Sequence, residues 1–273
     1  MAWEQLFAAG SPAIMGVLNV TPDSFSDGGL FTEPQKAVAR GLQLLAEGAV
    51  VVDVGGESTR PGAQPVAAEE ELARVLPVIR GLVAQAPQAA FSVDTWKTVV
   101  ARQALACGAC LVNDVRAGAD AGMLETVAQE GAGIVLMHMR GTPQTMQQDT
   151  RYTHVVAEVA EFLGQRAERA MAAGIPREHI FLDPGIGFGK DLAGNLALLQ
   201  ALPELAALGF PLVLGTSRKS FIGHLTGAAV GERLPGSLAS LLPALRCPRV
   251  LVRVHDVAAT RQFLAVARAV EGV

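Results

Sequence analysis

Short apolar runs alternate with amphipathic stretches along the whole chain. Eight runs have the length and Val/Ile/Leu content of buried strands; they cover residues 14–18, 50–54, 91–95, 111–115, 133–139, 180–184, 211–219 (a strand with its following loop) and 250–256. Between them, apolar positions recur at helical spacing over residues 33–48, 67–84, 97–107, 121–130, 153–173, 194–208, 219–246 and 257–270. The pattern predicts eight successive strand–helix units.

Strands that are apolar on both faces are typical of a parallel sheet covered by helices. Eight such units in 273 residues fit an α/β fold of the closed (β/α)8 type, a TIM barrel. No linker or low-complexity segment interrupts residues 1–273, which predicts a single domain. The alternative, an open doubly wound sheet, usually carries a glycine-rich fingerprint after its first strand. Here that strand is followed by Asn19-Val-Thr-Pro, so the barrel is favoured.

Net charge and hydropathy restrict the classes of partner that are expected for this chain. The net charge is −4 with no long basic run, which argues against nucleic acid as a partner. No apolar run approaches the roughly 18 residues that a membrane-spanning helix needs. The first residues, Met-Ala-Trp-Glu-Gln, show no secretory signal, and a cytoplasmic location is expected.

Polar residues stand at the end of each predicted strand. The carboxyl ends of the strands form one mouth of a barrel, where active sites are found. Several of these residues have a simpler individual explanation: Asp94 could cap the next helix, Asp53 could tie down its loop, and His138 could be a satisfied core histidine. Their coincidence at one end predicts an active site formed by Asn19, Asp53, Asp94, Asn113, Asp114, His138, Asp183, Ser217, Lys219, Arg253 and His255.

The chemistry of these residues divides in two. One set of acceptors and donors suits the edge of a flat heterocycle with amide and amino groups, since every buried polar atom of such a ligand needs a partner; it comprises Asp94, Asn113, Asp183 and Lys219. A second set suits an anion with Mg²⁺; it comprises Asn19, Arg60, Arg253 and His255. The segment Ser217-Arg218-Lys219, at a predicted helix start, could hold one carboxylate.

Covalent catalysis has no support in the sequence. There is no Gly-x-Ser-x-Gly elbow and no evident nucleophile–base pair. Gly185-Ile-Gly-Phe-Gly189 lacks the spacing of a dinucleotide motif, and its glycines are expected to let backbone approach a flat ligand. Catalysis by positioning and electrostatics, with a leaving phosphate group, is therefore predicted.

Eight motifs, in this order, resemble the dihydropteroate synthases of bacterial folate synthesis from Ile14 to His255. They occupy residues 15–29 (MGVLNVTPDSFSDGG), 56–62 (GESTRPG), 92–95 (SVDT), 113–115 (NDV), 137–143 (MHMRGTP), 183–190 (DPGIGFGK), 215–220 (GTSRKS) and 253–257 (RVHDV). The resemblance implies a pterin-binding barrel that joins 6-hydroxymethyl-7,8-dihydropterin diphosphate to 4-aminobenzoate and releases diphosphate.

The resemblance also implies roles for individual residues. Asp94, Asn113, Asp183 and Lys219 would hold the pterin, with Met137 or Met139 and Phe188 at its faces, and Asp94 would stabilise a pterin cation in a dissociative reaction. Asn19 would ligate Mg²⁺, and Arg253 and His255 would bind diphosphate. Thr59, Arg60, Pro61 and Phe25 would close over 4-aminobenzoate, whose carboxylate would lie at Ser217. A homodimer and a sulfonamide target are further expectations.

One segment departs from the family pattern. Where the family often has Thr and then His-Asn after Gly-Phe-Gly-Lys, this chain has Asp191, Gly194 and Asn195. Three alternatives remain beside the synthase: a methyltetrahydrofolate:corrinoid methyltransferase, a pterin-binding protein without turnover, and a barrel with an unrelated phosphate ligand. The diphosphate set of Asn19, Arg60, Arg253 and His255 counts against the methyltransferase.

Overall fold

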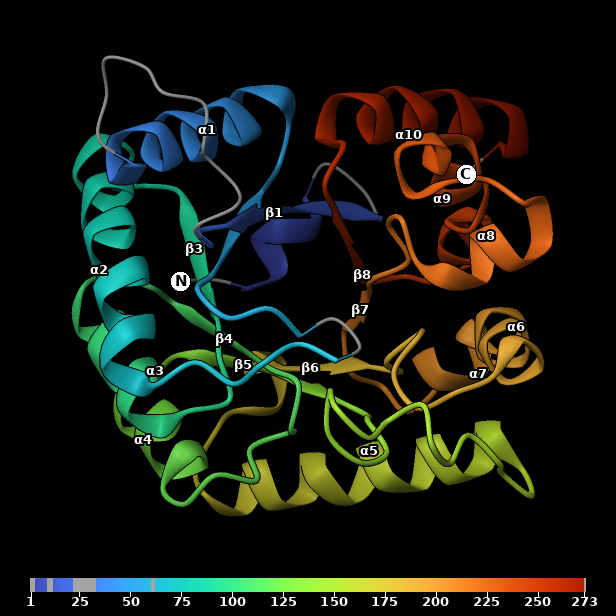
Figure 1. The fold of residues 1–273 in the computed structure, drawn as a ribbon, viewed down its shortest axis with the longest axis horizontal. Helices are drawn as coiled ribbons and strands as arrows, with labels where there is room; N and C mark the ends of the chain where they lie inside the picture. Colours follow the sequence, from blue (N-terminus) through green and yellow to red (C-terminus); the bar gives the residue numbers. More distant parts are fainter. Residues whose placement is uncertain (1–2, 9–11, 22–32, 60–61, 273) are drawn as a thin grey trace.

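The computed structural model describes residues 3–8, 12–21, 33–59 and 62–272, and its centre is a closed barrel of eight parallel strands in chain order (Figure 1). The strands are β1 (Ala13–Asn19), β2 (Val51–Gly55), β3 (Ala90–Asp94), β4 (Leu111–Asp114), β5 (Gly133–Met137), β6 (Ile180–Asp183), β7 (Leu212–Leu214) and β8 (Val250–Val254). Strand β8 pairs with β1 and closes the barrel. The predicted (β/α)8 fold is confirmed.

Helices surround the strands (Figure 1). They are α1 (Glu33–Glu47), α2 (Ala68–Gln85), α3 (Thr98–Ala106), α4 (Met123–Gln129), α5 (Val155–Ala172), α6 (Leu192–Gln200), α7 (Leu202–Ala206), α8 (Ser220–Thr226), α9 (Leu234–Ala239) and α10 (Val257–Glu271), with 3-10 turns η1 (Trp3–Phe7), η3 (Arg177–His179), η4 (Val230–Glu232) and η5 (Leu242–Arg246). None of the helices in the described ranges is long and apolar enough to cross a membrane.

Proline divides two of the segments that the sequence predicts as continuous helix. Residues 194–208 form two helices, because Pro203 lies in the first turn of α7. Residues 219–246 form α8, η4, α9 and η5, and the last two begin with Pro235 and Pro243 in their first turns. A proline lacks the N–H of a helix interior but suits a first turn, so each one starts a new helix.

The amino-terminal end of the barrel is filled by apolar side chains and sealed by η1. The Trp3 ring lies edge-on to Phe181, with ring centroids 5.4 Å apart. Trp3 and Leu6 pack with a layer of inward-facing strand residues: Ala13, Met15, Val51, Ala90, Leu111, Val135, Phe181, Val213 and Leu251. The sequence analysis did not predict η1. With one end closed by apolar packing, the polar chemistry of the interior is confined to the opposite end.

Strand register brings the predicted site residues level with one another. Asn19 of β1 is the register partner of Gly55 in β2, and Gly55 is that of Asp94 in β3. Asp94 in turn is opposite Asn113 in β4. Asn19, Asp94 and Asn113, which come from three different strands, therefore meet at one rim, as the strand-end pattern predicts.

Candidate active site

A cavity of about 710 Å³ lies at the carboxyl end of the barrel. Most of the predicted site residues line it, namely Asn19, Thr59, Asp94, Asn113, Asp183, Phe188, Ser217, Lys219, Arg253 and His255. Phe25, Arg60 and Pro61 lie outside the described residues. Met139 packs beside an apolar wall of four residues, all of which line the cavity: Val115, Met137, Met146 and Phe188.

Arg253 occupies the centre of a buried charge cluster. Its Nε donates to Asp53 Oδ2 and its Nη2 to Asp94 Oδ2, each over 2.6 Å. Asn113 Nδ2 also donates to Asp53 Oδ2, over 2.9 Å. The sequence predicts Arg253 at the diphosphate; in this structure its guanidinium is paired with two carboxylates at the edge of the same cavity. The sequence analysis allowed that Asp53 only ties down its loop. In the structure it accepts hydrogen bonds from two predicted site residues, Arg253 and Asn113.

Asp94 has an unusual electrostatic environment. Burial raises the pKa of Asp94 to about 7, the nearby Arg253 charge opposes that rise, and the Asp53 charge adds to it. Burial lowers the pKa of Arg253, but the charges of Asp53 and Asp94 outweigh that effect and leave it raised, so the guanidinium stays protonated. Oδ1 of Asp94 is buried with no partner among the described residues, although a buried carboxylate oxygen ordinarily has one.

A second wall combines a carboxylate, a cation and an aromatic face. Asp183 Oδ1 accepts a hydrogen bond from Gly185 N over 2.7 Å, and burial raises the pKa of this carboxyl. Lys219 Nζ lies 3.9 Å from the centre of the Phe188 ring. Burial lowers the pKa of Lys219 to about 8, against the opposing charge of Asp183. The wall offers an acceptor, a donor and a flat apolar surface.

Ser217 and His255 form one corner of the cavity. The Ser217 hydroxyl lies 2.9 Å from His255 Nδ1 and accepts a hydrogen bond from His255 N over 3.3 Å. Arg218, which has a positive φ of 60°, turns its guanidinium to Asp256 at 2.7 Å. The residues predicted for a carboxylate and for diphosphate are therefore direct neighbours.

The residues present fit a magnesium ion held with a phosphate ligand. Among the described residues no group of three or more His, Cys, Asp or Glu side chains could hold a metal by itself. Asn19 Oδ1 and Asp94 Oδ2 both flank Gly55: an added Cβ there would lie 3.8 Å and 3.5 Å from them. Magnesium binds oxygen ligands and often needs only one or two protein groups besides substrate phosphates. Asn19 therefore fits the predicted role.

The first and last glycines of the Gly185–Gly189 turn were expected to let the backbone approach a flat ligand, but they face the protein instead. A Cβ on Gly185 would come within 1.9 Å of His138 O, and one on Gly189 within 2.8 Å of Arg140 O. These glycines allow close approach to the loop after β5, whereas Gly187 lines the cavity. With φ values of 67° and 65°, both positions also favour glycine.

The segment that departs from the family pattern has a structural role. Asp191 caps α6 by accepting from Gly194 N over 2.7 Å. Asn195 Oδ1 accepts from Gly187 N over 2.6 Å, and its Nδ2 donates to Asp191 O over 2.8 Å. Asp191 and Asn195 thus support the glycine turn, and neither lines the cavity.

Several residues that line the cavity were not predicted as site residues, among them Glu57 and Met146. Glu57 follows β2 and binds Lys97, which also binds the fully buried Glu71 of α2. Met146, from a polar stretch after β5, contributes to the apolar wall. Glu57 belongs to the motif at residues 56–62, and that membership could have marked it as a site residue. Met146 is an isolated methionine among polar residues, and its sequence context gave no such signal.

Comparison with known proteins identifies the family. The model of the family described as pterin binding enzyme matches residues 15–255. The dihydropteroate synthase of Neisseria meningitidis serogroup B is 50% identical over 262 residues, which cover 93% of this chain and 91% of that protein. The Xanthomonas albilineans dihydropteroate synthase with 4-aminobenzoic acid has a TM-score of 0.89 and 50% identity, covering 96% of this chain and 94% of that one. Its complex with 7,8-dihydropteroate gives 0.85 and 47%, with coverage of 96% and 94%. The chain therefore belongs to the pterin-binding enzyme family and, within it, to the dihydropteroate synthases.

Proposed function

We propose that this chain joins 6-hydroxymethyl-7,8-dihydropterin diphosphate to 4-aminobenzoate, forming 7,8-dihydropteroate and releasing diphosphate. The observation that carries the proposal is the cavity wall, where Asp94, Asn113, Asp183 and Lys219 surround one space beside the Phe188 ring. The relatives named as dihydropteroate synthases, one bound to 4-aminobenzoic acid and one to 7,8-dihydropteroate, support the same reaction.

The heterocycle is recognised along its polar edge. Carboxylates of Asp94 and Asp183 accept from ring N–H and amino groups, and Lys219 donates to a ring oxygen or nitrogen. The unpartnered Oδ1 of Asp94 is suited to this, since a ligand N–H would satisfy it. Phe188 lies against one face of the ring, and Met137 belongs to the same apolar wall.

The reaction needs no enzyme nucleophile. The bond between the pterin methylene carbon and the diphosphate oxygen breaks, and the leaving diphosphate keeps the electron pair. The ionised carboxylate of Asp94 stabilises the cation that develops on the pterin. The arylamine nitrogen then forms the new carbon–nitrogen bond and loses one proton to the released diphosphate. The enzyme contributes positioning and electrostatic stabilisation.

The diphosphate leaving group is proposed to bind next to the pterin edge, since Arg253 is bonded to Asp94. His255 and Arg253 are the donors proposed for diphosphate, and Asn19 is the oxygen ligand proposed for Mg²⁺. When bound, Mg²⁺ would neutralise charge on the phosphate oxygens. Thr59 and the Ser217 hydroxyl are proposed to bind 4-aminobenzoate, together with Phe25, Arg60 and Pro61.

The decisive experiment is diphosphate release with and without 4-aminobenzoate, in Mg²⁺, for the wild type and Asp94→Asn. Release that depends on 4-aminobenzoate, with pteroate formed and most activity lost in Asp94→Asn, is the expected result. Pterin binding without release from either protein would refute the synthase and favour a binding protein. Methyl transfer from methyltetrahydrofolate to a corrinoid would favour the methyltransferase alternative.

The assembly and location are part of the same proposal. We propose a homodimer, on the resemblance to the family alone, and separately a cytoplasmic location. Sedimentation equilibrium across a range of concentrations should give a mass of twice 28.4 kDa. A stable 28.4 kDa species at micromolar concentration would contradict the dimer.

A further inference from the structure

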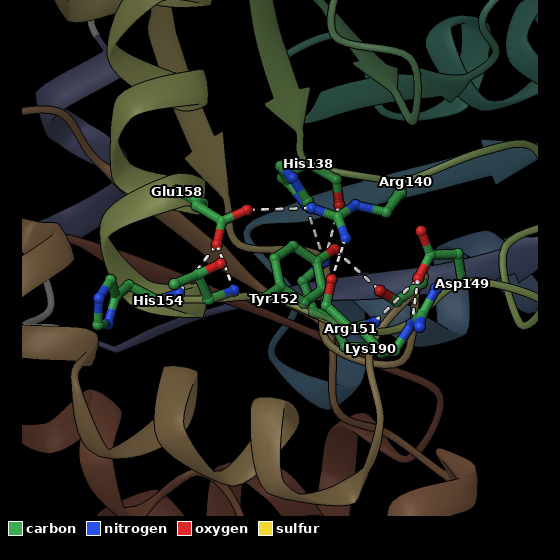
Figure 2. Close-up of polar contacts among 10 residues, drawn as sticks. His138, Arg140, Asp149, Arg151, Tyr152, His154, Glu158 and Lys190 are labelled. Carbon is green, nitrogen blue, oxygen red and sulfur yellow. Dashed lines mark hydrogen bonds and ion pairs between the residues drawn. The ribbon is translucent and has the colours of Figure 1, made fainter.

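Polar contacts join the loop after β5 to the glycine turn after β6 (Figure 2). The Tyr152 hydroxyl donates to Gly189 O over 2.9 Å, and the Arg140 guanidinium lies 3.8 Å from the centre of the Tyr152 ring. Arg140 also donates to Glu158 of α5 over 3.0 Å. This layer lies behind the cavity, because its members Arg140, Tyr152 and Glu158 do not line it.

Lys190 is the innermost member of this network. Its side chain is buried, and four acceptors surround its Nζ: Phe188 O at 2.8 Å, His138 Nδ1 at 2.9 Å, Gly185 O at 3.0 Å and His138 O at 3.2 Å. The ammonium thus binds both ends of the glycine turn: the carbonyl of Gly185, its first residue, and the carbonyl of Phe188, which precedes its last residue. It also fixes both to the end of β5.

The four acceptors around Lys190 Nζ form a cage, and this cage determines the protonation of His138. Burial, together with the charges of Lys190 and Arg140, lowers the pKa of His138 to about 3, so the imidazole is neutral. Burial also lowers the pKa of Lys190 to about 7, against the opposing charge of Asp183, so Lys190 is an ammonium below that pH. An ammonium has three donors and no acceptor, so below about pH 7 His138 Nδ1 accepts and the ring proton is on Nε2. The ring is held edge-on against Phe162, with centroids 4.9 Å apart.

The cage is built for an ammonium in particular. Gly185 is so close to His138 that a Cβ would lie 1.9 Å from His138 O, and the same Cβ would lie 3.3 Å from Lys190 Nζ. A compact ammonium with donors in three directions fits between these backbones. A planar guanidinium is larger and directs its donors into one plane, so arginine would not satisfy the same acceptors.

The turn that Lys190 binds carries two elements of the proposed pterin pocket. Gly185 N donates to Asp183 Oδ1 over 2.7 Å, which orients that carboxylate. Phe188, whose carbonyl Lys190 also binds, places its ring 3.9 Å from Lys219 Nζ. A shift of the turn would therefore displace the acceptor, the aromatic face and the neighbouring donor together.

We propose that Lys190 is a positioning residue of the pterin pocket, whose ammonium fixes the Gly185–Gly189 turn so that Asp183 and Phe188 meet the heterocycle in register. Lys190 itself does not line the cavity. The inference rests on the proposed function, because it takes a pterin as the occupant of the pocket. The hydrogen bonds of Lys190 are to His138, Gly185 and Phe188, and not to Ser217 or His255 at the proposed diphosphate corner.

The test combines binding and NMR. Affinity for 6-hydroxymethylpterin and, separately, for inorganic diphosphate with Mg²⁺ is measured by calorimetry on the wild type, Lys190→Met, Lys190→Arg and Leu6→Ala. Leu6→Ala is the matched control, since it removes buried contacts at the opposite end of the barrel. Histidine ¹⁵N–¹H correlation spectra of the wild type below about pH 7 report the His138 tautomer without any substitution.

Both Lys190 variants should weaken pterin affinity by about 10- to 100-fold, the size of effect expected when a supporting group lets a bound group shift by about 1 Å. Diphosphate affinity should be unchanged, Leu6→Ala should bind pterin as the wild type does, and His138 should carry its proton on Nε2. Unchanged pterin affinity in folded Lys190→Met, or equal loss of both ligands, would overturn the inference. A protonated Nδ1 in wild-type His138 would also overturn it, even if the variants do not fold. Failure of the wild type to bind pterin would instead refute the proposed function.

Discussion

Replacing Arg253 with methionine separates two roles for this residue. Methionine keeps much of the apolar stem and removes the guanidinium that pairs with Asp53 and Asp94 at 2.6 Å. If the guanidinium only binds diphosphate, the substitution should raise KM and leave stability unchanged. If it compensates the two carboxylates, the folded protein must lose stability before any substrate is added.

The structure gives the magnitude. The side chain of Asp53 is fully buried and that of Asp94 is 8% exposed, so both carboxylates are poorly hydrated once the guanidinium is gone. Removing one partner of a buried ion pair costs about 3–5 kcal/mol. For a chain of this size, that corresponds to a fall in Tm of roughly 10 °C. The double variant Asp53→Asn/Arg253→Met should be less destabilised than the two single effects summed, because one stranded charge is removed.

Urea unfolding followed by circular dichroism measures this difference. Arg218→Met is the matched control: its pair with Asp256 is as short, at 2.7 Å, but the two side chains are 43% and 26% exposed. Exposed pairs contribute about 0–1 kcal/mol, so this variant should unfold near the wild-type midpoint. If Arg253→Met unfolds as late as Arg218→Met, the charge-compensation reasoning is refuted.

Three further results are expected. The pH profile of kcat/KM should be a narrow bell: activity needs ionised Asp94 and protonated Lys219, so it falls as pH drops below about 7 and as pH rises above about 8; a flat rate from pH 5 to 9 would contradict these roles. Lys97→Met should lower the free energy of unfolding by about 3–5 kcal/mol, because Glu71 is left buried and unpaired, and should recover in part with Glu71→Met. Trp3→Ala should cost about 3–5 kcal/mol in the same urea assay and leave pterin affinity unchanged, since η1 lies at the far end of the barrel.

The barrel could be predicted from the sequence because its strands are buried on both faces and therefore appear as unbroken apolar runs. The helix boundaries after β6 and β7 could not, because apolar residues continue at helical spacing through Pro203. That proline was itself a signal, since proline is favoured in a first turn and disfavoured in a helix interior, although α2 tolerates Pro77. The sealing turn at Trp3 was missed because five residues are too few to show a period.

The candidate site was predictable as far as it depends on strand ends. Asp94, Asn113 and Asp183 are all the last or next-to-last residues of their strands, so the fold alone brings them to one rim. The pairing of Asp53 with Arg253 was not predictable, because the two lie 200 positions apart and only barrel closure makes them neighbours. Lys190 gave no signal of its cage, since three of its four partners are backbone carbonyls, which every residue has.

The position of Arg253 also connects the two halves of the proposed reaction. Its guanidinium is bound to Asp94, the carboxylate proposed to stabilise the pterin cation, and it lines the same cavity as His255 at the proposed diphosphate corner. An anion that attracts the guanidinium competes directly with Asp94 for it. Because Coulomb attraction is stronger in a buried site than in water, such competition would weaken the Asp94 pair as the leaving group binds. The negative charge of Asp94 would then be least compensated at the stage when positive charge develops on the pterin, which is where electrostatic stabilisation accelerates the reaction.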